Sequence, residues 1–252
     1  MNSPIVSQRA YCDFGPRFYW LDEADKDMKL LGIPETWQRA AEIIAEGGLV
    51  VFPTDTVYGV GCDPYNVDAI ARVFEAKSRS HLKALPLLLS DTSVLGRVTL
   101  GANRHVHALC KQFWPGALTI VLKKAADLPD DLGSATTVAV RVPDHLSLRG
   151  FISSCGGALA ATSANLSGQP DAVDAQSAEE YLGNRVQLVV DGGRARGGVP
   201  STVVDCTGDL PLVLRAGAIS RAWRREQRNT ARKRWRRFLP ARANARSRPR
   251  AR

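Results

Sequence analysis

The chain has 252 residues, of which 44% are hydrophobic and 23% charged, an ordinary composition for a soluble globular protein. Its length allows one large domain or two small ones. No apolar stretch is as long as a membrane span, and none resembles a secretory signal. The five cysteines are scattered without a C-x-x-C pair, which argues against a disulfide framework or zinc knuckle and predicts a cytoplasmic protein.

The net charge of +9 belongs to one end of the chain. Residues 221–252 contain 14 Lys and Arg and one Glu, a net charge of +13, so the other residues carry 20 Lys and Arg against 24 Asp and Glu. A segment this basic and poor in apolar residues is expected to be disordered. We therefore expect an N-terminal extension over 1–33, a folded domain over 34–220 and an Arg-rich tail over 221–252.

The folded domain begins with a helix from Pro34, which ends at Gly47-Gly48, and a buried strand over Gly48–Phe52 follows directly. This strand delivers a polar loop, Pro53–Tyr58, which we expect Gly59 and Gly61 to close as a turn. Further helices are expected over Val67–Lys77, Asn103–Phe113, Asp144–Ser154 and Ser177–Leu182. Further strands are expected over Leu85–Leu89, Leu118–Leu122, Thr137–Val142, Ala158–Ala161, Val186–Val190, Thr202–Asp205 and Leu212–Leu214. Helices alternate with strands early and strands dominate late, which predicts an α/β fold with a mixed sheet.

Four polar loops lie just after these buried elements, where α/β proteins bind ligands. Three separated cations, Lys77, Arg79 and Arg215, suit a polyanion such as a nucleotide. Lys77 and Arg79 could equally complete a helix C-terminus, and Arg141 could belong to a structural ion pair inside its strand. The four loops are Thr54–Tyr58, Lys77–Arg79, Thr162–Asn165 and Val199–Thr202.

Several familiar chemistries are excluded by the sequence. It contains no G-x-x-x-x-G-K-[ST] phosphate loop and no G-x-S-x-G nucleophile elbow. His105 and His107 are two residues apart on a predicted helix, so they cannot share a metal ion, and His145 near a helix end is expected to be solvated. An enzyme with these residues would act by positioning its substrates and stabilising charge.

Seven short motifs occur in an order and spacing that resemble one known family. The chain is similar over residues 36–220 to the YrdC/Sua5/TsaC family of L-threonylcarbamoyladenylate synthases. The motifs are Pro53–Gly59 (PTDTVYG), Lys77–Arg79 (KSR), Phe113–Gly116 (FWPG), Thr137–Pro143 (TVAVRVP), Ser163–Gly168 (SANLSG), Ser201–Asp205 (STVVD) and Leu214–Ile219 (LRAGAI).

The resemblance implies a twisted mixed β-sheet flanked by helices around a large, positively charged cavity. It further implies a nucleotidyltransferase that converts L-threonine, bicarbonate or CO2 and ATP, with Mg2+, into threonylcarbamoyl-AMP and diphosphate. A downstream transferase complex would then use the product for N6-threonylcarbamoyladenosine (t6A37) modification of tRNA.

Carried over by motif, the residues expected to contact threonine are Thr56, Arg141, Ser163 and Ser201, with Arg141 pairing the carboxylate. Those expected to contact ATP are Arg79, Lys83, Thr137, Asn165 and Arg215. The resemblance places Lys77 at the phosphates and makes Lys77 and Arg79 the catalytic pair.

The chain departs from the family pattern at three places. Ser80 and Ala84 stand where prolines are common, and Asp171-Ala172-Val173 stands where a Ser or Thr is usual. An ATP contact is therefore expected to be missing there or replaced by backbone.

The basic tail leaves two interpretations open. It is either an arm that binds tRNA or double-stranded RNA, with Trp235 available for stacking, or a solvated appendage. A noncatalytic RNA-binding or ribosome-maturation protein, using the same cavity and tail, is the alternative to the enzyme. A protein that only binds RNA would not need all of the cations and polar residues of the motifs together. The sequence contains all six of them, which favours the enzyme: Lys77, Arg79, Arg141, Ser163, Asn165 and Arg215.

Overall fold

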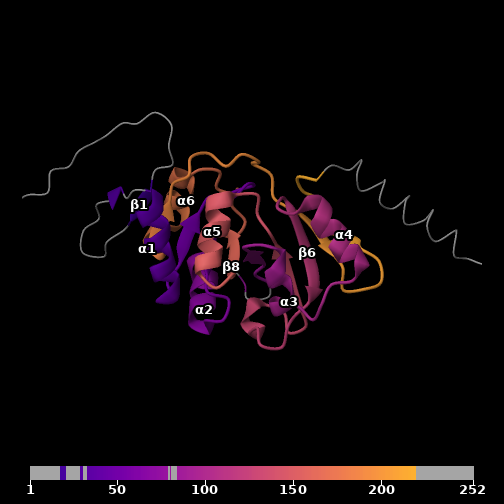
Figure 1. Cartoon of the computed structure of the whole chain (residues 1–252). Coiled ribbons are helices and arrows are strands. Elements are labelled where there is room, and N and C mark those ends of the chain that lie inside the picture. Colours follow the sequence, from indigo (N-terminus) through magenta and orange to yellow (C-terminus); the bar gives the residue numbers. More distant parts are fainter. Residues whose placement is uncertain (1–17, 21–28, 31–32, 79, 81–83, 220–252) are drawn as a thin grey trace, which may run out of the picture. The chain divides into compact units, whose positions relative to one another are not determined.

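The computed structural model describes residues 18–20, 29–30, 33–78, 80 and 84–219 (Figure 1). The α-helices are α1 Ile33–Ala45, α2 Val67–Ala76, α3 Leu95–Val98, α4 Arg104–Phe113, α5 Leu146–Ser154 and α6 Ala175–Leu182, and the 3-10 helices are η1 Thr92–Val94, η2 Asp130–Leu132 and η3 Gly183–Arg185. The strands are β1 Phe18–Trp20, β2 Lys29–Leu30, β3 Val50–Phe52, β4 Gly59–Cys62, β5 Leu87–Leu89, β6 Leu118–Lys123, β7 Thr137–Arg141, β8 Ala158–Ser163, β9 Leu188–Val190, β10 Thr202–Asp205 and β11 Leu212–Arg215.

The described strands form one mixed sheet in the order β11-β10-β6-β7-β5-β8-β4-β3-β9-β1-β2. Strand β3 pairs parallel with β9 and antiparallel with β4, and β6 pairs parallel with β10 and antiparallel with β7. The predicted α/β fold with a mixed sheet is therefore confirmed. No helix in the described part of the chain is long and apolar enough to cross a membrane.

The hydrophobic core lies between the sheet and the helices α1 and α5, which also contact each other. Phe151 of α5 packs against Trp37 of α1, with ring centroids 5.0 Å apart, and edge-on against Phe52 of β3 at 6.1 Å. These contacts fix the carboxyl end of β3, from which the polar loop leaves the sheet.

Gly59 and Gly61 do not close a turn as predicted, because both lie inside the buried strand β4. A Cβ on Gly61 would lie 2.9 Å from the Ala160 carbonyl oxygen and 3.0 Å from the Phe52 ring. The glycines therefore let strand β4 approach its neighbours closely, and the polar loop ends at Tyr58.

The helix boundaries follow their capping residues. Asn66 and Asn103 cap α2 and α4 as predicted. Helix α6 starts two residues earlier than predicted, because Asp174 and Ser177 form a capping box.

The expectation of a solvated His145 is wrong. His145 is half-buried and caps α5, where its Nδ1 accepts a hydrogen bond from Leu148 N at 3.2 Å. Burial lowers the pKa of His145.

Two short strands fall within the segment expected as an N-terminal extension. Strand β1 pairs antiparallel with β9 and with β2. The basic tail lies outside the described residues, so the division into extension, domain and tail stays a prediction.

Candidate functional site

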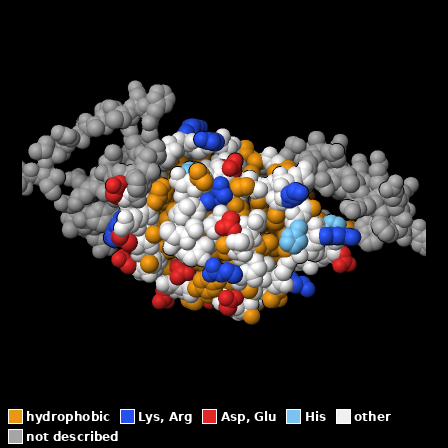
Figure 2. Space-filling view, viewed as in Figure 1, with side chains coloured by type: hydrophobic (Ala, Val, Ile, Leu, Met, Phe, Trp, Pro, Cys, Tyr) orange, Lys and Arg blue, Asp and Glu red, His pale blue; other side chains and the backbone are white. Residues whose placement is uncertain are grey.

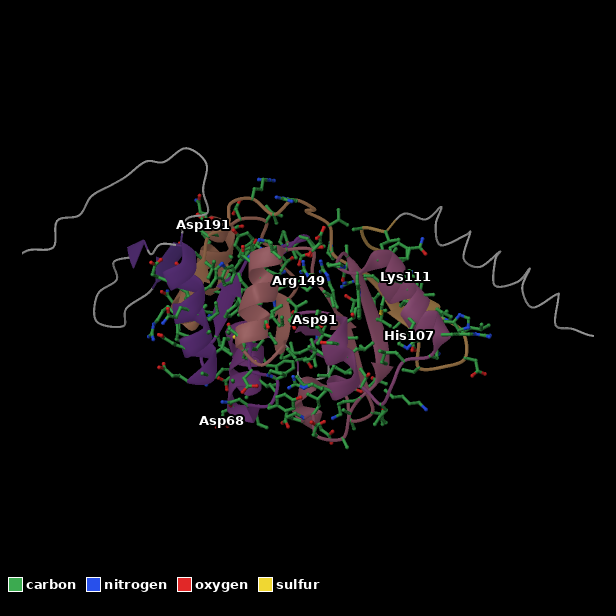
Figure 3. The ribbon with its side chains drawn as sticks, viewed as in Figure 1. Asp68, Asp91, His107, Lys111, Arg149 and Asp191 are labelled. Carbon is green, nitrogen blue, oxygen red and sulfur yellow. The ribbon has the colours of Figure 1, made fainter. Side chains whose placement is uncertain are left out.

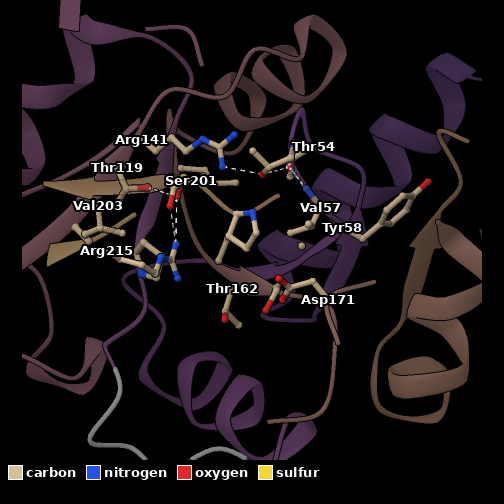
Figure 4. Close-up of a pocket in the computed structure, with 18 of the residues that line it drawn as sticks. Thr54, Val57, Tyr58, Thr119, Arg141, Thr162, Asp171, Ser201, Val203 and Arg215 are labelled. Carbon is tan, nitrogen blue, oxygen red and sulfur yellow. Dashed lines mark hydrogen bonds between the residues drawn. The ribbon is translucent and has the colours of Figure 1, made fainter. Parts of the chain in front are cut away.

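A cavity of about 300 Å³ opens among the strands β5, β6, β7, β8, β10 and β11 and the loop after β3 (Figure 4). Its lining residues run from Thr54 to Arg215, so the fold brings together motifs far apart in the sequence. Its charged and hydroxyl-bearing lining residues are Thr54, Thr56, Tyr58, Thr119, Arg141, Thr162, Ser163, Asp171, Ser201 and Arg215.

The loop after β3 is organised by Thr54. Its hydroxyl accepts hydrogen bonds from Thr56 N at 3.0 Å and Val57 N at 3.3 Å and donates to Val57 O at 2.7 Å. Tyr58 is fully buried, and its hydroxyl donates to Gly193 O at 2.6 Å, which ties this loop to the segment after β9. Burial raises the pKa of Tyr58 well above its usual value, so the phenol remains a neutral donor.

Arg141, at the end of β7, is 6% exposed and spreads its guanidinium over three partners. Nε donates to Gly116 O at 2.9 Å, Nη1 to Thr56 Oγ1 at 2.9 Å and Nη2 to Asp55 Oδ1 at 2.5 Å. Burial lowers the pKa of Arg141 against the opposing effect of Asp55, but the group stays charged because arginine is not deprotonated in proteins. The ion-pair interpretation of Arg141 is confirmed, and the residue also lines the cavity, where one N–H on each Nη remains for a ligand.

A second cluster joins β6, β10 and β11 on the cavity wall. Thr119 Oγ1 lies 2.7 Å from Ser201 Oγ, and Arg215 Nη2 donates to Ser201 O at 3.1 Å (Figure 4). These bonds fix the Ser201 hydroxyl and bring the Arg215 guanidinium to the cavity.

Lys77, the C-cap residue of α2, is 1% exposed and does not line the cavity. Its ammonium donates to Ser163 O, to Asn165 O and, at 3.0 Å, to Asn165 Oδ1. Ser163 Oγ donates to the same amide oxygen at 2.6 Å, and Asn165 Nδ2 donates to Gln169 O at 2.6 Å. Lys77 thus holds the loop after β8 from behind the cavity.

The residues expected to contact threonine lie together: all four, Thr56, Arg141, Ser163 and Ser201, line this cavity. Of those expected to contact ATP, Arg215 lines it as well, whereas Thr137 and Asn165 do not. Thr137 shares one face of β7 with the lining residues Ala139 and Arg141, because side chains alternate along a strand. Arg79 and Lys83 lie outside the described residues.

The sequence reasoning missed Thr119, placed Thr54 in a candidate loop without a role of its own, and gave Asp171 no role, although all three line the cavity. Thr119 could have been found as a polar residue in an otherwise apolar strand. Asp171 is the acidic side chain among the lining residues (Figure 4).

The described residues contain no group of three or more His, Cys, Asp and Glu side chains that could hold a metal ion. His107 and Lys111 project from α4, and His107 is exposed while His105 is half-buried (Figure 3). The two histidines therefore differ in environment, as their spacing predicted.

The fold and site define an α/β protein in which strand ends and loops surround a cavity with two arginines and many hydroxyl groups. A family model described as telomere recombination, for Sua5, YciO and YrdC proteins, matches residues 42–217. The threonylcarbamoyl-AMP synthase of Bacillus subtilis is 40% identical over 185 residues, which cover 73% of this chain and 54% of the relative. A putative threonylcarbamoyl-AMP synthase of Mycobacterium tuberculosis is 37% identical over 200 residues, covering 79% of this chain and 90% of the relative.

Among solved structures, Pyrococcus abyssi Sua5 complexed with L-threonine superposes with a TM-score of 0.70 at 38% identity, covering 73% of this chain and 54% of that one. The chain therefore spans about half the length of the curated relatives from Bacillus subtilis and Pyrococcus abyssi. The chain belongs to the Sua5/YciO/YrdC family.

Proposed function

We propose that the chain is a threonylcarbamoyl-AMP synthase that condenses L-threonine, bicarbonate or CO2 and ATP. One observation carries the proposal: Thr56, Arg141, Ser163 and Ser201, which come from four separate motifs, line one cavity together with Arg215. The structure of the Pyrococcus abyssi relative contains L-threonine, which supports threonine as the amino-acid substrate.

At the amino-acid end, Arg141 would bind the threonine carboxylate through its remaining N–H donors. The contact with Asp55 holds the guanidinium in place before the substrate arrives, so little side-chain freedom is lost on binding. The hydroxyls of Thr56, Ser163 and Ser201 would then position the rest of the amino acid.

At the nucleotide end, Arg215 would meet ATP, and Thr137 and Asn165 would extend the binding surface beyond the cavity. Positive charge here would come from Arg215, Arg141 and the expected cations Lys77, Arg79 and Lys83. It would offset the repulsion between two anionic substrates, bicarbonate and ATP.

Magnesium fits the site as an ion bound mainly by ATP. Mg2+ prefers oxygen ligands and is commonly held by one or two carboxylates together with substrate phosphates. The Asp171 carboxylate and the Thr162 hydroxyl are oxygen donors among the lining residues. When bound, the ion would neutralise charge on the leaving diphosphate.

The reaction forms two bonds and breaks one at phosphorus. The neutral amine of threonine bonds to the carbon of CO2, with release of one proton to solvent, or to the carbon of bicarbonate, with release of one water molecule, and gives a carbamate. A carbamate oxygen then attacks the α-phosphorus of ATP, and the bond to diphosphate breaks. The protein would contribute by orienting the carbamate, excluding water and stabilising charge.

Purified protein supplied with ATP, Mg2+, bicarbonate and L-threonine should release diphosphate only when all four are present, because the α-phosphate needs the carbamate as its nucleophile. Diphosphate release measured with and without threonine is the test, with L-serine as a control for amino-acid specificity. Release that ignores threonine, or no release, would refute the enzyme and leave the noncatalytic RNA-binding alternative.

The downstream partner would be a transferase complex that moves the threonylcarbamoyl group to tRNA. Acidic and basic side chains are interspersed on the face seen in Figure 2. Residues 221–252, with a net charge of +13, are the strongest candidate in the sequence for RNA binding.

Deletion of residues 221–252 should weaken tRNA binding and reduce its salt dependence, because it removes a net charge of +13. Diphosphate release should be unchanged. Binding isotherms for tRNA at several salt concentrations test this, and equal affinity of both proteins would favour the solvated appendage.

A further inference from the structure

The carboxylate of Asp171 lines a cavity whose proposed ligands are mostly anions. ATP, bicarbonate and the carboxylate of threonine are all negatively charged, so an acidic group beside them is unfavourable unless a cation lies close to it. Asp171 is half-buried, and its side chain makes no hydrogen bond or ion pair with any residue that the structure describes. Its oxygens are therefore available to a cationic group of a ligand.

The backbone that follows Asp171 is fixed by two hydrogen bonds from other loops. Tyr58 N donates to Ala172 O at 2.8 Å, and Ala195 N donates to Val173 O at 2.7 Å. Ala172 itself is 1% exposed. The position of Asp171 relative to the loop after β3 is therefore set by the fold.

This anchoring places Asp171 at the amino-acid end of the cavity. Tyr58, which holds Ala172, also accepts a hydrogen bond at its backbone oxygen from Ala164 N at 2.8 Å, directly after Ser163. Thr56 stands two residues before Tyr58, and both Thr56 and Ser163 are expected to contact threonine. Asp171 thus lines the same part of the cavity as these two hydroxyl groups.

An α-amino acid carries two opposite charges on one carbon, and the cavity offers a partner for each. Arg141 keeps N–H donors for the carboxylate. Figure 4 shows Asp171 on the opposite side of the cavity from Arg141. The neighbouring acid Asp55 does not line the cavity, and its Oδ1 already accepts from Arg141 Nη2 at 2.5 Å.

We propose that Asp171 binds the ammonium group of the amino-acid substrate, so that Arg141 and Asp171 together select an α-amino acid by its two charges. The proposal rests on the proposed function, because it takes threonine as the ligand of this cavity. Mg2+ is the other cation of the reaction, but it would be held mainly by the phosphates of ATP. The contacts of Ala172 with Tyr58 favour the ammonium, because they place Asp171 beside the loop that carries Thr56.

The test measures two ligands on the Asp171→Asn variant of the full chain. Asparagine keeps the size of the side chain and removes its charge. Calorimetry without ATP and Mg2+ gives the Kd of L-threonine and of 2,3-dihydroxybutanoate of the same configuration, in which a hydroxyl replaces the ammonium. We expect threonine to bind about tenfold more weakly or worse, the effect of losing one charged hydrogen bond. The affinity for dihydroxybutanoate should change less than about twofold, because this ligand has no ammonium to lose.

Two further variants are controls for charge and for the other end of the ligand. Asp63 is half-buried just beyond the far end of β4, does not line the cavity and accepts from Tyr65 N at 2.9 Å. Asp63→Asn also removes one negative charge and should leave the Kd of threonine within about twofold of its original value. Arg141→Gln should weaken both ligands, because both carry a carboxylate.

Three results would overturn the proposal: an unchanged Kd of threonine in Asp171→Asn, an equal loss of affinity for both ligands, or the same loss in Asp63→Asn. An unchanged Kd together with a higher Mg2+ requirement for diphosphate release would assign Asp171 to the metal instead. If threonine binding depends on Asp171 but no diphosphate is released, the proposed function fails and the ammonium contact stands. If diphosphate is released and threonine binding ignores Asp171, the reverse holds. A wild-type protein that does not bind threonine would refute both.

Discussion

Arg141→Gln should lower threonine-dependent diphosphate release by about 100-fold or more, because truncating one partner of a buried charge pair costs about 2–5 kcal/mol. Arg141 lines the cavity together with Thr56, Ser163 and Ser201, and it is already held by Gly116 and Asp55. Glutamine keeps part of the side-chain length but cannot pair with a carboxylate. The loss should appear as a weaker Kd for threonine, measured by calorimetry, with little change in the affinity for ATP.

The same substitution also affects folding, so a second variant is needed. Asp55, with a side chain 12% exposed, would lose its cationic partner, and breaking a buried pair from one side costs about 3–5 kcal/mol of stability. In the double variant Arg141→Gln with Asp55→Asn, two neutral amides face each other and the charge penalty disappears. The double variant should regain most of the lost thermal stability and still fail to bind threonine. Recovery of threonine binding together with stability would show that Arg141 acts only as a structural partner of Asp55.

Most strands and most helix boundaries can be anticipated from local signals, but the short strands β1 and β2 and the glycine-rich strand β4 were not. The motifs include several residues that line the cavity. Asn66 and Asn103 are visible as caps because a capping interaction is local in sequence. Gly59 and Gly61 were misread because the close approach of Phe52 and Ala160 is a tertiary contact that no local pattern records. A glycine after a polar loop has the same appearance whether it ends a turn or starts a crowded strand.

The electrostatic partners in the site are equally invisible to local reasoning. Arg141 lies 86 residues from Asp55, and Lys77 lies 88 residues from Asn165. The sequence shows that each cation needs a partner, but the partner is chosen by the sheet order that places β4, β8, β5 and β7 side by side. Prediction from sequence therefore named several residues that line the cavity and left their pairings open.

Lys77→Met should reduce kcat for diphosphate release by about 100-fold, the effect of losing one preorganised donor for developing charge. Methionine preserves the length of the buried stem, but the Ser163 and Asn165 oxygens lose their ammonium donor. Two roles predict different kinetics. A cation that acts on the phosphates lowers kcat, whereas one that only holds the loop carrying Ser163 raises KM for threonine and leaves kcat nearly unchanged.

Lys124→Met is the control for the loss of stability that follows when any buried lysine loses its ammonium group. Lys124 is 6% exposed, and its ammonium donates to Leu128 O at 2.9 Å, Pro129 O at 3.1 Å and Asp130 Oδ1 at 2.5 Å, away from the cavity lining. Both variants should lower the unfolding temperature, because each leaves buried carbonyl oxygens without a donor, at about 1–3 kcal/mol each. Only Lys77→Met should lose activity once both are assayed well below their unfolding temperatures. A fall in kcat at constant KM for threonine would then require Lys77 to act on the reacting groups. That in turn requires its ammonium to exchange at least one of its present partners, Ser163 or Asn165, for a phosphate oxygen during the reaction.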